Sequence, residues 1–232
     1  MIRHVIWDWN GTLLDDTEAC VNSVNRMLEV RRFPLITVEA YRQIFDFPVI
    51  RYYEKLGFNL ATENWDAIAV EFHRHYAEYA RHAPLRHGIE HVLATLSETG
   101  FEMSILSASE INILNRMLTE HGIRNYFRHI SGLDNLHAAS KLENGKMLIR
   151  QINLPADDVI LVGDTCHDHD VATAMGIRCM LLTGGHQHES RLPSDDMVPS
   201  TDVLIQKIRS EGQLTDAQGV RHAIPERHNR LS

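Results

Sequence analysis

One short pattern occurs three times in this chain and constrains its fold more than any other feature. Gly100, Gly122 and Gly176 each follow a helical segment and stand shortly before an apolar run. Glycine is favoured directly after a helix because it adopts the left-handed backbone conformation there. The apolar runs that we interpret as strands cover residues 2–7, 101–106, 127–130, 159–162 and 177–182. Strands that alternate with helices predict an α/β fold, with a mostly parallel sheet covered on both faces.

Residues 16–83 interrupt this alternation, because they show helical periodicity and no convincing strand. Eleven of the 16 aromatic residues fall between Phe33 and Tyr79, which indicates a separate small core. The alternative is that this segment forms long surface helices of a single domain. We expect a main domain, an inserted helical cap and a polar C-terminal tail, over residues 1–15 with 84–210, 16–83 and 211–232 respectively.

Helix boundaries are marked by capping residues and by apolar spacing. In the insert, Thr37 is placed to cap a helix that ends at the Phe47-Pro48 pair. Apolar residues at helical spacing predict further helices within residues 21–28, 65–81, 89–96, 111–118 and 142–152.

Composition excludes several classes of protein. The 232 residues carry a formal charge of −8, which disfavours nucleic acid as a partner, and 44% apolar content excludes wholesale disorder. Fifteen His residues would raise the charge to +7 if all were protonated. Three Cys without a CxxC pair indicate a reducing compartment, and no apolar run approaches a membrane span. Asp8 also interrupts the first apolar run before a signal-peptide core could form, so we expect a soluble cytoplasmic protein.

Polar side chains follow the strand candidates at the points where the strands end. Residues 8–12 follow the first strand, residues 107–109 the second, and Asp164 and Asp168 the fourth, while Lys141 lies on the connection before the fourth. The carboxyl ends of parallel strands meet at one edge of the sheet, where ligands bind. We therefore expect these side chains to form one site.

The types of residue at this edge suit phosphate chemistry with a metal ion. Paired carboxylates repel each other without a cation, and Mg²⁺ prefers oxygen ligands and retains waters that a phosphate can replace. Gly11 would let backbone N–H groups approach an anion, Ser107 could donate to a phosphoryl oxygen, and Lys141 could neutralise charge. Asp8 could be a metal ligand only, or also a nucleophile.

These segments resemble the haloacid dehalogenase superfamily. The segment DWNGTLLD at residues 8–15 is similar to its first motif, usually Asp-x-Asp-Gly-Thr. Ser107, Lys141 and the pair Asp164 and Asp168 resemble the second, third and fourth motifs, in the same order along residues 2–182. The helical insert resembles the cap of this family. The match looks closest to the phosphoglycolate-phosphatase-like branch, which implies a Rossmann-like core.

The resemblance implies a role for each matched position. Asp8 would be the nucleophile that forms an aspartyl-phosphate and also a Mg²⁺ ligand. The backbone carbonyl of Asn10, with Asp164 and Asp168, would complete the metal site. Gly11, Thr12, Ser107, Ala108 and Lys141 would hold the phosphoryl group of a small phosphorylated metabolite, and Lys141 would orient Asp8.

Asn10 departs from the family pattern, which usually has Asp at this position. That Asp serves as general acid for the leaving alcohol and then as base for water, and an amide can do neither. We therefore expect metal and phosphate binding to survive while hydrolysis of alkyl esters is impaired.

Each candidate residue also has an ordinary structural explanation. Asp8 could cap the next turn, the two later acids could stabilise a helix N-terminus, and Ser107 could cap a helix, although we assign that cap to Ser109. Lys146 competes with Lys141 for the phosphate role, but Lys141 better suits the loop before the helix.

Other conspicuous residues are interpreted conservatively. Arg42, Arg51 and Lys55 could bind a substrate anion, but such side chains more often form a solvated helix face. Tyr52 and Tyr53 are assigned to the core and Cys166 to a plain small side chain. His186 and His188 are interpreted as loop histidines, because nothing near them in sequence completes a zinc site.

The overall expectation is a Mg²⁺-dependent phosphatase, either a monomer or a homodimer. A signalling receiver domain also uses Asp, Ser or Thr and Lys at strand ends, but the Gly11-Thr12 turn and the long insert oppose it. A catalytically weak or silent phosphate-binding protein is supported by Asn10 alone. A phosphonate or haloacid hydrolase also tolerates a residue other than Asp at position 10, although a dehalogenase would not need Asp164 and Asp168.

Overall fold

The computed structural model describes residues 1–212, apart from the side chain of Asp196. Its centre is a parallel six-stranded sheet with the order β3-β2-β1-β4-β5-β6. The expected α/β fold and all five expected strands are confirmed, and the pattern missed only β6, which is two residues long. The strands are β1 (His4–Trp7), β2 (Glu102–Glu110), β3 (His129–Leu133), β4 (Val159–Gly163), β5 (Arg178–Leu182) and β6 (Met197–Val198).

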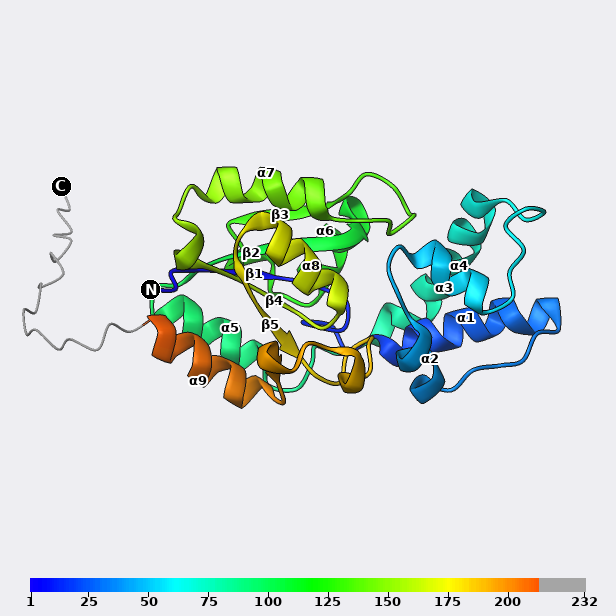
Figure 1. The fold of residues 1–232 in the computed structure, drawn as a ribbon, viewed down its shortest axis with the longest axis horizontal. Coiled ribbons are helices and arrows are strands. Elements are labelled where there is room, and N and C mark those ends of the chain that lie inside the picture. Colours follow the sequence, from blue (N-terminus) through cyan, green and yellow to red (C-terminus); the bar gives the residue numbers. More distant parts are fainter. Residues whose placement is uncertain (213–232) are drawn as a thin grey trace, which may run out of the picture.

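Helices cover both faces of the sheet, which makes a three-layer molecule (Figure 1). Because side chains alternate along a strand, Val5 and Trp7 of β1 pack into one hydrophobic core and Ile6 into another. The first core includes α5 (Ile89–Glu98), α6 (Ile111–Glu120) and α9 (Thr201–Gly212), and the second includes α7 (Leu142–Ile152) and α8 (Cys166–Met175).

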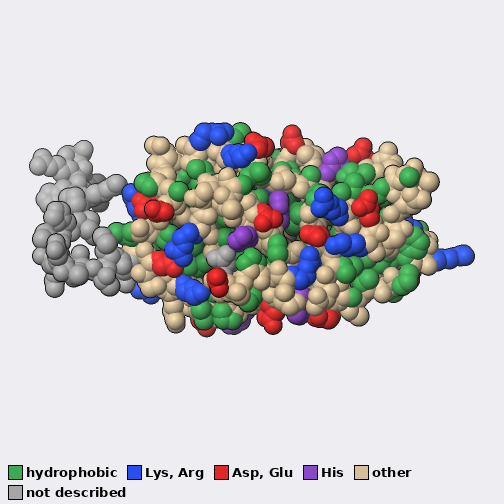
Figure 2. All heavy atoms as spheres, in the orientation of Figure 1, with side chains coloured by type: hydrophobic (Ala, Val, Ile, Leu, Met, Phe, Trp, Pro, Cys, Tyr) green, Lys and Arg blue, Asp and Glu red, His purple; other side chains and the backbone are tan. Residues whose placement is uncertain are grey.

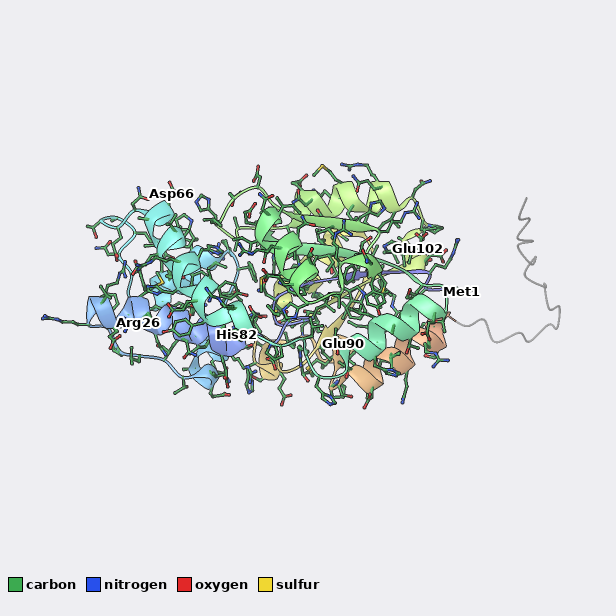
Figure 3. All side chains as sticks on the ribbon, turned by 180° about the vertical axis from the view of Figure 1, so that it is seen from behind. Met1, Arg26, Asp66, His82, Glu90 and Glu102 are labelled. Carbon is green, nitrogen blue, oxygen red and sulfur yellow. The ribbon has the colours of Figure 1, made fainter. Side chains whose placement is uncertain are left out.

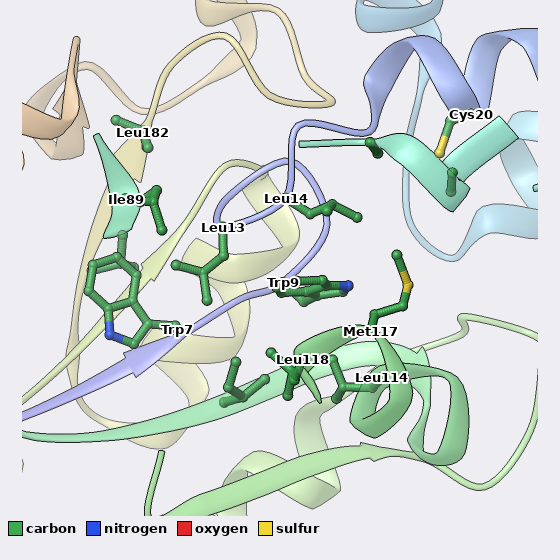
Figure 4. Close-up of a cluster of buried hydrophobic side chains, with 14 of the residues drawn as sticks. Trp7, Trp9, Leu13, Leu14, Cys20, Ile89, Leu114, Met117, Leu118 and Leu182 are labelled. Atoms are coloured by element: carbon green, nitrogen blue, oxygen red, sulfur yellow. The ribbon is translucent and has the colours of Figure 1, made fainter. Parts of the chain in front are cut away.

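The turn after β1 is anchored by apolar side chains on both sides of Asp8. Trp7, Trp9 and Leu13 are fully buried and lie together in the core between β1, α5 and α6 (Figure 4). The backbone N–H groups of Leu13 and Leu14 donate to the carbonyl of Trp9, at 2.9 and 3.0 Å. Burial of each large apolar side chain contributes about 1.5–3 kcal/mol, so this turn holds Asp8 firmly.

A group of helices, here called the helical unit, lies beyond the carboxyl ends of the strands (Figure 1). It consists of α1 (Thr17–Arg31), α2 (Val38–Ile44), α3 (Val49–Lys55) and α4 (Trp65–Tyr79), followed by a 3₁₀ turn at Ala80–His82. Seen from behind, Arg26 and Asp66 mark this unit, while Glu102 and Met1 lie toward the other end of the molecule (Figure 3).

Helix boundaries in the unit agree only partly with the sequence prediction. Thr37 caps α2 as expected, and its side chain accepts a hydrogen bond from the backbone N–H of Ala40. However, α2 ends at Ile44 rather than at the Phe47-Pro48 pair, and Pro48 is instead the N-cap of α3, which the pattern missed. A seven-residue helix such as α3, which has no side-chain cap, carries too little periodicity to be recognised.

Two short stretches connect the unit to the sheet, and side chains fasten α2 to the loop after β5. Leu14 forms a β-bridge with Leu85 where the two connections run side by side. Arg42 of α2 donates to the backbone carbonyls of Gly184 and Gly185, at 2.7 and 2.9 Å. The unit therefore contacts the sheet domain directly above the strand ends.

The C-terminal helix extends slightly further than expected. Residues 211 and 212 are the last residues of α9, and Glu211 pairs with Arg178 of β5. The rest of the expected polar tail, residues 213–232, lies outside the described residues. Within residues 1–212, no helix combines the length and apolar character that a membrane span requires. Acidic and basic side chains are interspersed on the face shown in Figure 2.

Candidate active site

Two carboxylates reach the same edge from the ends of neighbouring strands. Asp8 follows β1 and its backbone N–H donates to the carbonyl of Val162 in β4, while Asp164 directly follows β4. A third carboxylate comes from Asp168 in the first turn of α8. One oxygen from each of the three lies within 4.8 Å of the others, and all three side chains are buried.

Lys141, the N-cap residue of α7, places a single ammonium group among these acids. Its Nζ lies 2.5 Å from oxygens of both Asp8 and Asp168, and it also donates to the backbone carbonyl of Leu106 at 3.1 Å. Lys146, the sequence competitor, is half-buried and pairs with Glu143 on its own helix. The structure thus brings Lys141 and not Lys146 to this edge.

The turn after β1 shapes the space around Asp164. The Thr12 hydroxyl donates to Asp164 at 3.1 Å and lies 3.4 Å from Asp8. Gly11 has a φ of 72°, and a Cβ there would lie only 2.3 Å from an oxygen of Asp164. A side chain at Gly11 would therefore displace this carboxylate.

One oxygen of the Asp168 carboxylate accepts several hydrogen bonds, whereas the other is buried without a hydrogen-bond partner among the described residues. Its Oδ2 accepts from the backbone N–H of Thr165 at 3.0 Å and from the Thr165 hydroxyl at 2.6 Å, which forms a capping box at the start of α8. Its Oδ1 faces Lys141. In this arrangement Asp168 holds Lys141 in position through an ion pair and caps the N-terminus of α8.

Burial and neighbouring charges shift the pKa values of the ionisable groups in this cluster. Burial raises the pKa of Asp8 to about 8 and that of Asp164 to about 6, in spite of the nearby positive charges. Burial acts against the charged form of Lys141, but the Asp168 and Asp8 carboxylates outweigh it and raise its pKa. The same lysine outweighs burial at Asp168 and lowers the pKa of that carboxyl.

The charges of the cluster fit a divalent cation. When all three carboxylates are ionised, they and the single ammonium leave two negative charges in a buried space, which is costly without a further cation. Asp8 and Asp164 offer hard oxygen donors, and the carbonyl of residue 10 lies on the same turn. Mg²⁺ matches this donor set, whereas the cluster offers no thiolate or imidazole that would favour a softer metal.

A cavity of about 130 Å³ opens from this cluster toward the helical unit. Ser107, Ala108 and Lys141 line it, whereas Gly11 and Thr12 are not among the described residues on its wall. Ser107 lies in the irregular end of β2, and its hydroxyl accepts from the backbone N–H of Ser109. The cap of α6 is Glu110, and not Ser109 as the sequence suggested, because the Glu110 carboxylate accepts from two backbone N–H groups of the first turn.

Beside this cluster lies a second polar network, which the sequence did not reveal. Asp16 accepts hydrogen bonds from the Asn10 amide and the Tyr76 hydroxyl, both at 2.7 Å, and lies 3.2 Å from His186. The Oδ1 of Asn10 accepts from the hydroxyl of Ser109 at 2.5 Å. Both polar atoms of the Asn10 side chain, Nδ2 and Oδ1, thus form hydrogen bonds with other side chains of the protein.

His186 and Asp16 form a buried ion pair within this network. Burial disfavours a charged imidazole, but Asp16 outweighs it and raises the pKa of His186 to about 9. Burial also opposes charge on Asp16, and His186 lowers the pKa of that carboxyl. His186 lies in the loop after β5, as expected from the sequence, but its burial and its pairing with Asp16 were not predicted, whereas His188 lies apart and bonds Ser190.

The cationic residues of the helical unit do not reach the cavity. Arg42 binds backbone carbonyls of the loop after β5, Arg51 is exposed, and Lys55 pairs with Asp46. Tyr52 and Tyr53 are buried as expected, and both also line the cavity. Cys166 is half-buried, and its thiol lies 3.1 Å from the carbonyl oxygen of Arg191.

Comparison with known proteins agrees with this geometry. A family model described as haloacid dehalogenase-like hydrolase matches residues 5–182. Phosphoglycolate phosphatase 1 of Pseudomonas aeruginosa is 27% identical over 194 residues, which cover 80% of this chain and 71% of the relative. A phosphoglycolate phosphatase of Xanthomonas campestris is 28% identical over 214 residues, which cover 88% of this chain and 92% of the relative.

Solved structures show the same fold. A predicted phosphatase from Clostridium acetobutylicum has a TM-score of 0.74 at 21% identity, over 90% of this chain and 99% of that one. CbbY from Rhodobacter sphaeroides in complex with phosphate has a TM-score of 0.64 at 20% identity, over 86% and 95% of the two chains. The chain belongs to the haloacid dehalogenase-like hydrolases.

Proposed function

We propose that this protein is a Mg²⁺-dependent phosphatase that acts on a small phosphorylated metabolite through an aspartyl-phosphate. The observation that supports this most directly is the buried cluster of three carboxylates and one lysine, which needs a further cation when all three carboxylates are ionised. Relatives named phosphoglycolate phosphatase over most of the chain support phosphate monoesters as substrates. We also propose a cytoplasmic location and a monomeric or homodimeric state.

In this proposal Asp8 attacks phosphorus and the surrounding groups hold the phosphate. The hydrogen-bonded turn after β1 keeps the Asp8 carboxylate at the polar end of the cavity. Lys141 binds phosphoryl oxygens together with Ser107 and Ala108, and Asp168 fixes the lysine in position. Mg²⁺, held by Asp8, Asp164, the carbonyl of residue 10 and, directly or through water, Asp168, would neutralise charge on the phosphate. Thr12 orients the Asp8 and Asp164 carboxylates, and Gly11 leaves room for them.

Asn10 limits the leaving groups that the proposed site can release. The amide cannot protonate a departing oxygen, and its donors are already engaged with Asp16 and Tyr76. The leaving group must therefore depart as an anion, which favours acyl, aryl and anhydride phosphates over alkyl phosphates. We include the carbonyl of Asn10 in the proposed metal site and exclude its side chain from acid–base catalysis.

Two alternative functions follow from the same residue. A silent phosphate-binding protein would keep the metal cluster and lack turnover, and a phosphonate or haloacid hydrolase would act on a different bond. The retained Asp164, which a metal-free dehalogenase would not need, favours the phosphatase.

The proposed function is tested with a panel of phosphate esters and acetyl phosphate at several Mg²⁺ concentrations. Hydrolysis should require Mg²⁺, stop with excess EDTA and return when Mg²⁺ is restored. The matched variant Asp8→Asn should abolish turnover while keeping the circular dichroism spectrum of the wild type, and beryllofluoride should add density at Asp8 in a crystal. Full activity in EDTA, or wild-type rates in Asp8→Asn, would contradict the proposal.

A further inference from the structure

The cavity has a polar end and an aromatic end. Its polar end is formed by the carboxylate cluster and Lys141, and its other end is built almost entirely by the helical unit. The aromatic and aliphatic residues that line this second end are Val24, Tyr41, Phe45, Phe47, Val49, Tyr52, Tyr53, Trp65, Phe72 and Tyr76. A group attached to a phosphate at the polar end would therefore lie against aromatic rings.

The volume limits how large that group can be. At about 130 Å³ the cavity is similar to the roughly 150 Å³ of an apolar protein cavity that binds benzene. Phe47 stacks on His167 of α8 at 4.5 Å between ring centroids, which narrows the space between the helical unit and the sheet domain. Because the same space of about 130 Å³ also has to hold the phosphate, the leaving group can be no larger than about one ring.

Of the residues that the structure describes on this wall, Lys141 is the only lysine or arginine, and it belongs to the phosphate end. Four histidines also lie among the described residues on the wall, and of these His73 lies 3.3 Å from the carbonyl oxygen of Leu136 while His167 stacks on Phe47. His137 bonds Asp66, and the charge on His186 is balanced by Asp16. A carboxylate on the leaving group would have no cationic partner, and burying an unpaired charge is costly.

We propose that the natural substrate is an aryl phosphate, the phosphate ester of an uncharged, single-ring phenol. This proposal deepens and depends on the proposed phosphatase function. It joins two independent features, the aromatic wall without a free cation and the absence of an acid at Asn10, because a phenol leaves as its anion far more readily than an alcohol. The small carboxylated substrate in the names of the relatives is the kind of molecule that this wall excludes.

The reaction then needs no proton donor in its first step. An oxygen of Asp8 forms a bond to phosphorus, the bond from phosphorus to the aryl oxygen breaks, and its electron pair leaves with the phenolate. Water then attacks the aspartyl-phosphate, which releases inorganic phosphate and restores Asp8. The proton that water gives up passes to solvent or the phosphate, and the phenolate takes a proton from solvent.

Four substrates distinguish phosphatase activity as such from a preference for an uncharged aryl leaving group. They are acetyl phosphate, phenyl phosphate, 3-carboxyphenyl phosphate and phosphoglycolate. The two aryl esters have leaving groups of nearly equal basicity and differ in one carboxylate. With Mg²⁺, kcat/KM for phenyl phosphate should exceed that for 3-carboxyphenyl phosphate and for phosphoglycolate by about 30-fold or more. Acetyl phosphate should also be hydrolysed, because its leaving group needs no acid and no wall contact.

The outcomes distinguish the two proposals. If acetyl phosphate is hydrolysed but phosphoglycolate or the carboxylated aryl ester matches phenyl phosphate, the aryl assignment is wrong and the phosphatase function stands. If no substrate in the set, acetyl phosphate included, is hydrolysed with Mg²⁺, both are wrong.

A pair of variants at Val49 tests the wall itself. Val49 is half-buried at the start of α3 and lines the cavity. Val49→Arg adds the missing cation, and Val49→Gln is its uncharged control of similar length. Val49→Arg should raise the ratio of kcat/KM for 3-carboxyphenyl over phenyl phosphate by about tenfold or more, while Val49→Gln should not. Because the ratio is measured within one protein, partial unfolding does not affect it, and an unchanged ratio in Val49→Arg would contradict the assignment.

Discussion

At the residue scale, the arrangement around position 10 is the most unusual part of the candidate site. Asn10 lies 2.7 Å from Asp16, so a carboxylate is present beside the position where the family usually has one. Asp16 is fully buried, however, and its oxygens are held by His186, Tyr76 and the backbone N–H of Gly11. The negative charge of Asp16 is therefore engaged in hydrogen bonds and an ion pair within the protein.

We expect a charge-conserving exchange, Asn10→Asp with Asp16→Asn, to extend activity to alkyl phosphates. Asp at position 10 would supply the missing general acid, which is typically worth about 10²–10⁴-fold. The ratio of kcat for an alkyl phosphate to kcat for acetyl phosphate should rise by at least about 10²-fold, since acetyl phosphate needs no acid. Asn10→Asp alone places two carboxylates side by side and serves as the comparison. An unchanged ratio in both variants would show that another group already supplies the proton.

At the scale of elements, the turn between β1 and α1 is shaped by the carboxylate that it surrounds. Gly11 and Gly122 share a φ of 72°, but only Gly11 is close to another group. A Cβ at Gly11 would also approach the His186 ring, at 2.6 Å. Glycine at this position is thus required by the close approach of Asp164 and by the backbone conformation together.

The pair Gly11→Ala and Gly122→Ala separates these two requirements. Gly122→Ala should lose about 1–2 kcal/mol of unfolding free energy, because it forces Ala into the left-handed region, and Gly11→Ala should lose at least as much, because its Cβ also meets Asp164. Only Gly11→Ala should also lose Mg²⁺-dependent hydrolysis, by about 10²-fold or more, because it displaces Asp164. Urea unfolding measures the first effect, and rates against Mg²⁺ concentration measure the second. Equal activity in the two variants would contradict this role for Gly11.

The same elements show what could be predicted from the sequence. The strands of the sheet and α7 were predictable because their apolar periods and flanking glycines are local signals. Lys141 was distinguishable from Lys146 because it directly precedes a helix. The network of Asp16, Tyr76 and His186 was not predictable, since its members lie 60 and 170 residues apart and meet only when the helical unit packs on the sheet.

At the scale of the whole molecule, histidines decide how the protein responds to acid. The chain contains 15 His, which suggests a steep rise in charge as pH falls through about 6.5. Burial opposes part of this rise, since it lowers the pKa of His4 to about 4 and also lowers that of His73. These buried imidazoles remain neutral in the folded state at a pH where the unfolded chain takes up protons.

His4 should account for a measurable part of acid destabilisation. Its side chain is fully buried in β1, and its Nε2 lies 2.9 Å from the hydroxyl of Ser104. Above about pH 6.5 the imidazole is neutral in both states, so it contributes no pH dependence. Between about pH 6.5 and pH 4 only the unfolded state binds the proton, so the unfolding free energy falls by about 1.4 kcal/mol per pH unit.

Urea unfolding at about pH 7.5 and about pH 5 tests this expectation with two variants. The wild type should lose about 2 kcal/mol more than His4→Gln over this interval, because Gln can keep a hydrogen bond to Ser104 but cannot titrate. His91 lies exposed on α5, so His91→Gln should lose as much as the wild type. Equal losses in wild type and His4→Gln would mean that His4 takes up its proton without unfolding, by moving into solvent or by drawing Glu102 closer than its present 3.5 Å.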